Sequence, residues 1–81
     1  MTKQEMAEET AKIEKAVDEF AAFMKRRLRA KLKQGYRGWD NRNLVFGKKF
    51  HHSLAMDVIQ RPRQKAVDIA NRAMMLWFCS R

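Results

Sequence analysis

The first 34 residues contain neither glycine nor proline, and apolar side chains recur along them at helical spacing. The recurring positions are Met6, Ile13, Val17, Phe20, Met24, Leu28 and Leu32. Thr2 and Glu5 have the spacing of a capping box, and Gly35 is a favourable residue just beyond a helix end. We therefore predict one helix over about residues 2–34. At 1.5 Å per residue it would be about 45–50 Å long, so one end projects from a small domain or packs against a second copy.

Two shorter helices are predicted after this one. Apolar residues recur every four positions at Phe46, Phe50, Leu54 and Val58, which predicts a helix over about residues 46–60. Pro62 ends this helix, because the residue before a proline avoids the α region. Pro62 also suits the first turn of a third helix over about residues 62–79, where its missing N–H costs nothing.

The third predicted helix is apolar on most sides, which is typical of a central, mostly buried helix. Its apolar residues at helical spacing are Ala66, Ile69, Ala70, Ala73, Met74 and Trp77. The polar exceptions are Asp68, Asn71 and Arg72. Asn71 and Arg72 follow Asp68 by three and four residues, so all three share a face. No segment shows strand-like alternation. We predict an all-α fold, a three-helix protein with a long N-terminal helix and two shorter packed helices, forming a single domain over residues 1–81.

The small size of the chain favours self-association. A domain of this length buries only about 60% of the surface that its unfolded chain exposes, and it is marginally stable alone. Domains of this kind depend on cross-links or on oligomerisation. Because the apolar faces exceed what 81 residues can bury, we expect a homo-oligomer, for example a dimeric helical bundle.

Charge is distributed unevenly along the chain. Residues 1–20 hold six acids and three lysines, a net charge of −3, whereas residues 21–81 hold fifteen Lys and Arg and three Asp, a net charge of +12. A basic excess of this size indicates an acidic partner, either nucleic acid or the acidic surface of a protein. The alternative is that the charge only keeps the helices soluble.

The candidate binding residues lie at the end of the first helix and in the segment after it. The helix end carries a run of cations: Lys25, Arg26, Arg27, Arg29, Lys31 and Lys33. The predicted loop over residues 35–45 alternates aromatic residues with arginines: Tyr36, Arg37, Trp39 and Arg42. Such a combination can contact phosphates and stack on bases. The other interpretation is a solvated helix end whose cations suit the helix dipole, and a loop whose aromatics fold onto the core. Asp40 is placed to cap a following helical turn.

The sequence gives little support for a metal site, a cofactor site or a disulfide. Cys79 is the only cysteine, so no disulfide forms within the chain, and we expect a buried structural thiol. His51 and His52 are adjacent and point about 100° apart on a helix, so they chelate one metal poorly. No signal-peptide pattern and no apolar run of about 20 residues occur, so we expect a cytoplasmic protein without membrane association.

Asp57 and Asp68 are the only acids on the two C-terminal helices. If these helices pack antiparallel, the two carboxylates could approach one another. Two carboxylates hold magnesium only with help from substrate phosphates and water. The alternative is a pair of ordinary surface or capping acids.

Two segments resemble known proteins. GYRGWD at residues 35–40 and DIANRAMMLW at residues 68–77 are similar to a group of small phage and prophage proteins. In these, a helix with a basic end leads into a G-x-x-GWD turn, and the last helix reads D-V/I-A-N-x-A-M-M. That helix resembles the one in MazG-like all-α nucleotide pyrophosphohydrolases. The resemblance covers roughly the second half of the chain, and it implies a helical fold and a phage origin.

The residues expected of that enzyme family are mostly replaced. Its members hold magnesium with a helical E-E-x-x-E cluster and a later E-x-x-D pair. Only Asp68 matches, with Asn71 beside it, while Lys65 replaces the preceding acid. The second predicted helix offers His51, His52 and Ala55 where the cluster belongs. Magnesium binding without those acids would be weak, which argues against the enzyme.

These observations lead to one expected function and two alternatives. We expect a non-catalytic phage accessory protein, without cofactor, that binds a host macromolecule in the host cytoplasm. Its partner would be an acidic protein surface or nucleic acid, and for a phage, inhibition of a host enzyme or defence complex would fit. The first alternative is a divergent magnesium-dependent nucleotide pyrophosphohydrolase that uses Asp68 and Asp57. The second is a structural helical subunit.

Overall fold

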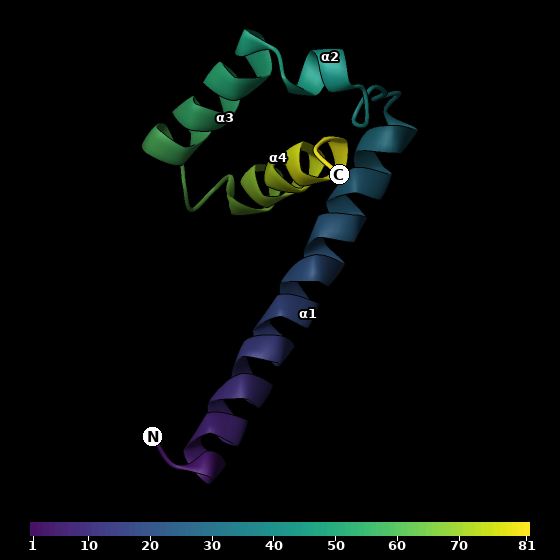
Figure 1. Ribbon diagram of the computed structural model, residues 1–81. Helices are drawn as coiled ribbons and strands as arrows, with labels where there is room; N and C mark the ends of the chain where they lie inside the picture. Colours follow the sequence, from purple (N-terminus) through teal and green to yellow (C-terminus); the bar gives the residue numbers. More distant parts are fainter.

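The computed structural model describes residues 1–81 and contains four helices and no strand. They are α1 (Lys3–Lys33), α2 (Arg42–Val45), α3 (Lys48–Gln60) and α4 (Ala66–Cys79). Figure 1 shows α1 as a straight rod, with the other three helices gathered beside its C-terminal half. The predicted all-α fold with a long first helix is confirmed. No helix combines the length and the hydrophobicity that crossing a bilayer requires.

Both ends of α1 lie close to the predicted ends, at the capping residue Thr2 and at Gly35. The Oγ1 of Thr2 accepts the N–H of Glu5 at 3.1 Å, so Thr2 caps the first turn. At the other end Gly35 adopts φ +93°, and its N–H bonds to the carbonyl of Leu32 at 3.0 Å. The N–H of Tyr36 reaches back to the carbonyl of Lys31, also at 3.0 Å, which completes a Schellman motif.

The region between α1 and α3 is more helical than predicted. A separate short helix, α2, lies within the segment predicted as a loop, and α3 begins at Lys48 instead of residue 46. The cap of α2 is Asn41, whose Oδ1 accepts two backbone N–H groups, and Asp40 does not serve as the cap. Gly47 separates the two helices with an extended conformation (ψ 157°), so α3 begins two residues later than predicted.

The third predicted helix also starts later than expected. α3 ends at Gln60, as Pro62 predicts, but the residues from Pro62 to Lys65 form a turn, and α4 begins at Ala66. The N–H of Lys65 bonds to the carbonyl of Arg61 at 3.0 Å and closes this turn. The turn reverses the chain, so that α4 packs against both α3 and α1.

The core is small and lies around α4. Its buried apolar members are Val45, Met75 and Cys79, and the partly buried residues packed on them are Leu28, Trp39, Phe50, Met74 and Leu76. Cys79 is a buried free thiol, as predicted. Only four of the 81 residues are buried, so this core leaves much apolar surface uncovered.

The buried face of α4 is not the one that the apolar spacing indicates. Ala66, Ala73 and Trp77 lie on the exposed side, and Trp77 is 62% exposed. The fourth buried residue is Asn71, which belongs to the polar face of this helix. That face turns inward because its polar groups find partners on α1 and α3, as described below.

Candidate functional site

Four of the predicted binding residues form one exposed stripe on α1. These residues, Lys25, Arg26, Arg29 and Lys33, are named here the basic stripe. Lys25, Arg29 and Lys33 are four residues apart, so they follow one another along the helix surface. All four side chains are exposed.

The basic stripe has no acidic partner within the chain. The four ion pairs of the molecule join Lys12 to Glu9, Arg27 to Asp68, Lys65 to Asp68 and Arg72 to Asp57. Within the stripe, the guanidinium of Arg26 lies 5.4 Å from the ring centroid of Phe23, a contact that leaves its charge intact. The positive charge of the stripe is therefore available to an external anion.

The other two cations of the run belong to the packing of the molecule. The Nε of Arg27 donates to the Oδ1 of Asp68 at 3.0 Å, which joins α1 to α4. The Nζ of Lys31 lies 5.7 Å from the ring centroid of Tyr36 and is partly buried. The run therefore divides into four cations without a partner and two that contact the rest of the fold, although Arg27 itself stays partly accessible. The prediction treated all six cations as one site.

The aromatic residues after α1 fold onto the core. The ring of Trp39 packs at 4.8 Å, centroid to centroid, on the ring of Phe78. The hydroxyl of Tyr36 lies 4.0 Å from the sulfur of Met75. This geometry favours the structural interpretation of these aromatics over base stacking, although Tyr36 keeps about a third of its surface exposed.

The two arginines of this segment are held close to the chain. Arg37 donates from one Nη to the carbonyls of Leu32 and Tyr36, at 3.1 and 2.8 Å. The guanidinium of Arg42 lies 5.7 Å from the ring centroid of Phe46. Both residues are exposed and keep their charge, so they add to the positive field beside the basic stripe.

Asp57 and Asp68 are each engaged by an arginine. The Oδ2 of Asp57 lies 2.8 Å from an Nη of Arg72, and both side chains are largely buried. Burial by itself raises the pKa of Asp68, but the hydrogen bond and charge of Arg27, together with nearby lysines, outweigh it and hold that pKa below its ordinary value. The carboxylates thus face guanidinium groups, where a magnesium ion would need them free.

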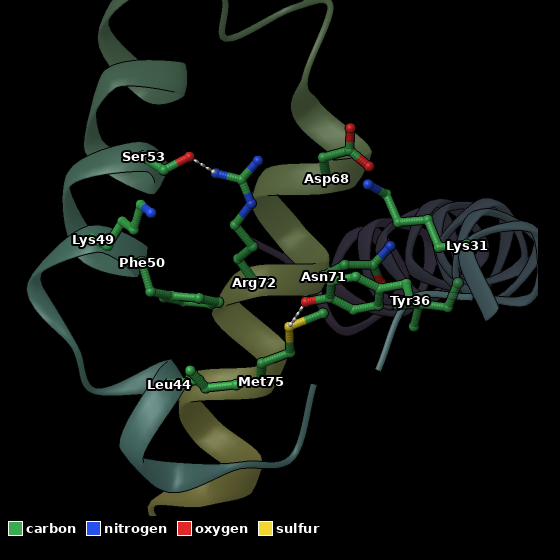
Figure 2. Close-up of a pocket in the computed structure, with 11 residues that line it drawn as sticks. Lys31, Tyr36, Leu44, Lys49, Phe50, Ser53, Asp68, Asn71, Arg72 and Met75 are labelled. Atoms are coloured by element: carbon green, nitrogen blue, oxygen red, sulfur yellow. Dashed lines mark hydrogen bonds between the residues drawn. The ribbon is translucent and has the colours of Figure 1, made fainter. Parts of the chain in front are cut away.

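A cavity of about 360 Å³ lies between the end of α1, α3 and α4. Figure 2 shows its walls, with Lys31 and Tyr36 on one side and Lys49 and Phe50 on the other. Arg72 crosses the space from α4 and donates to the hydroxyl of Ser53 on α3 at 3.1 Å. The cavity therefore combines aromatic walls with three cations, Lys31, Lys49 and Arg72.

Asn71 is the one buried polar side chain on this cavity. Its Nδ2 donates to the backbone carbonyl of Met24 on α1 at 3.3 Å, whereas its buried Oδ1 has no hydrogen-bond partner. With Arg27–Asp68 and Arg72–Asp57, this bond explains why the polar face of α4 turns inward.

Sequence reasoning did not place Arg72, Ser53 and Lys49 in a site. Arg72 contacts Ser53 and Asp57, which lie far from it in the chain, and no local pattern predicts such pairs. The only signal was the polarity of Asn71 and Arg72 on an otherwise apolar helix. His51 and His52 are both exposed, and no three His, Cys, Asp or Glu side chains converge on a possible metal position.

Comparisons with protein-family models, with curated proteins and with solved structures found no match to this chain. The similarity of residues 35–40 and 68–77 to phage proteins therefore stays a prediction from those short motifs.

Proposed function

We propose that this protein is a non-catalytic binding protein that contacts an anionic macromolecule, either nucleic acid or an acidic protein surface, through the basic stripe. One observation carries the proposal. Four cations are exposed on one side of a helix, none is paired with an acid, and they belong to a part of the chain with a net charge of +12.

The helix makes the stripe a rigid surface. α1 is capped at both ends, and its C-terminal half is fixed to α4 through the pair between Arg27 and Asp68. Anchored cations lose less freedom on binding than cations on a flexible tail, and clustered charge of one sign speeds the encounter with an anion. Because the aromatic residues fold inward, we expect charge to dominate over base stacking.

The biological setting comes from the phage-like motifs and not from the geometry. A phage accessory protein would work in the host cytoplasm, and its partner would be a host macromolecule. Inhibition of a host enzyme or defence complex fits a small basic protein that covers an acidic site. The self-association expected from the sequence belongs to the same proposal.

Charge reversal of the stripe tests this function. In the triple variant Lys25→Glu, Arg29→Glu and Lys33→Glu, we expect affinity for the anionic partner to fall by at least about 100-fold, since each lost phosphate or carboxylate contact costs on the order of 1 kcal/mol. The probes are duplex DNA, single-stranded RNA and polyglutamate, each measured by fluorescence anisotropy. Circular dichroism should show unchanged helicity.

A matched control carries the same change in net charge on the same helix. The variant Lys3→Glu, Lys12→Glu and Lys15→Glu reverses three exposed lysines in the N-terminal half of α1. We expect a much smaller loss of affinity from this variant. Sedimentation of all three proteins is measured beside the affinity, so that a change in oligomeric state is separated from the loss of an anion contact. An equal loss in both would mean that only net charge matters, and would reject the stripe as a site.

The cavity supports a second candidate, a divergent nucleotide pyrophosphohydrolase. Asp68 lies on its wall with Tyr36, Phe50 and three cations, a composition suited to a nucleotide. The pairing of Asp68 with Arg27 and of Asp57 with Arg72 argues against it. This function requires magnesium-dependent release of pyrophosphate that disappears in Asp68→Ala.

A further inference from the structure

The folded chain exposes more surface than a compact protein of its mass. Its accessible surface is 6750 Å², whereas a compact monomer of 9.6 kDa exposes about 5,100 Å². Its radius of gyration is 15.6 Å, against about 11.7 Å for a compact domain of this length. The excess of roughly 1,600 Å² is about twice the 800 Å² that one partner buries in a standard interface.

The N-terminal half of α1 contributes to this excess. Every residue from Lys3 to Glu19 is exposed, and Figure 1 shows this half extending away from the other helices. Met6, Ile13 and Val17 form an apolar stripe along it, and Ile13 is 60% exposed. These three residues lie on the side of α1 that, one turn further on, packs against α4.

A second apolar surface lies between α3 and α4. The residues lining this open groove are His51, Leu54, Ala55, Val58, Ile59 and Leu76. Ile59 is 73% exposed. Exposed cations lie at both ends of α3, with Lys48 at the start and Arg61 and Arg63 after the end.

The charges indicate what covers the two surfaces. The exposed half of α1 lies within residues 1–20, whose net charge is −3, and the groove lies in the part of the chain with a net charge of +12. Two copies of the acidic half would repel one another, whereas an acidic half and a basic groove attract. Within one molecule the two cannot meet, because α1 is a continuous helix that leads away from the groove.

We infer that the N-terminal half of α1 packs in the α3–α4 groove of a second copy, which inserts its own α1 in return. The lengths agree, since the exposed 17 residues from Lys3 to Glu19 span about 25 Å and the 13 residues of α3 about 20 Å. In a two-fold dimer this contact occurs twice and closes the assembly. This contact specifies the self-association included in the proposed function, but it does not depend on anion binding, because the basic stripe takes no part in it.

Analytical ultracentrifugation of the full chain and its variants tests the inference. The wild-type chain should be a dimer at micromolar concentration. Ile13→Asn on α1 and Ile59→Asn on α3 should each raise the dissociation constant by at least about tenfold, because each removes apolar area from the contact. Both side chains are exposed in the single chain, so neither substitution should disturb the core around α4.

The control is Ala11→Asn. Ala11 is exposed like Ile13, but it lies two residues earlier and therefore on the opposite side of the helix. It should change the dissociation constant by less than about threefold. A wild-type chain that stays monomeric at about 100 μM overturns the inference, because an interface of this size should hold well below that concentration. A dimer that Ile59→Asn leaves intact also overturns it.

Disulfide trapping checks the pairing directly. A mixture of the single variants Ile13→Cys and Ile59→Cys should form a mixed disulfide dimer under mild oxidation, while neither variant alone should cross-link. The native Cys79 is only 5% exposed and should not compete. Cross-linking of Ile13→Cys with itself would place two α1 helices together and would contradict the assignment.

Discussion

At the scale of single residues, Asp68 joins α4 to α1 by an ion pair. Its Oδ1 accepts from Arg27 at 3.0 Å, and its Oδ2 lies 3.8 Å from the Nζ of Lys65. The pKa of Asp68 lies below its ordinary value because these cations favour the ionised form more than burial opposes it. An acid whose pKa is lowered by folding stabilises the folded state above its unfolded pKa, and this stabilisation is lost as the pH falls through the folded pKa.

We predict that Asp68→Asn lowers the free energy of unfolding at pH 7 by about 1 kcal/mol, because Arg27 and Lys65 lose a charged partner near the surface. The same variant should show a smaller loss of stability between pH 7 and pH 3 than the wild type, since the titrating group is gone. Urea unfolding monitored by circular dichroism across this range measures both effects.

The control for this prediction is Asp40→Asn, an exposed acid that makes no ion pair. It should leave the stability at pH 7 nearly unchanged. If Asp68→Asn kept the wild-type dependence on pH, the ion pair with Arg27 would not contribute as described.

At the scale of elements, α1 is one helix with two environments. Its C-terminal half is anchored on α4, and its N-terminal half has only its own hydrogen bonds and local contacts. An unsupported helical half of this length is marginal in water, because most helical stability in proteins comes from packing. Contact with a second copy would supply that packing.

Hydrogen exchange should therefore depend on protein concentration in one part of α1. We predict that exchange of the backbone amides of residues 6–17 slows by at least about fivefold when the chain passes from mostly monomer to mostly dimer. The amides of α4 near Met75 should change much less, since they are already in the core. Equal rates at both concentrations for residues 6–17 would contradict a contact there.

The sequence predicts the elements where a local signal sets their limits. Thr2, Gly35 and Pro62 place three of the helix ends, because side-chain capping, left-handed φ and the restriction of the residue before proline act on neighbouring residues. It does not predict α2, whose cap is one residue after the expected Asp40. Nor does it predict the inward face of α4, which depends on partners such as Asp57 and Arg27 that lie far away in the chain.

The same limit applies to the candidate site. The cation run and its helical state were predictable, and so was an excess of apolar surface. The division of the run into an unpaired stripe and two residues that contact the rest of the fold, Arg27 and Lys31, was not predictable, because it depends on where α4 and Tyr36 pack.

At the scale of the whole molecule, the surfaces proposed for self-association and the surface proposed for anion binding lie in different places. The acidic half of α1 and the α3–α4 groove are suited to a second copy, while the basic stripe stays open for an external anion. A dimer would carry two such stripes, and simultaneous binding of both to a long polyanion would strengthen the contact beyond that of one copy.

The most direct test of the charge-driven function is binding across a salt series. The purified protein is titrated with duplex DNA, single-stranded RNA and polyglutamate from about 50 to 300 mM salt, a range over which phosphate contacts weaken strongly. We predict binding to at least one of these three polyanions. For DNA, the slope of log affinity against log salt concentration should be about −3 to −4 for each stripe that binds, as expected for four cations. Failure to bind any of the three at low salt, or an affinity that salt does not change, would contradict the account.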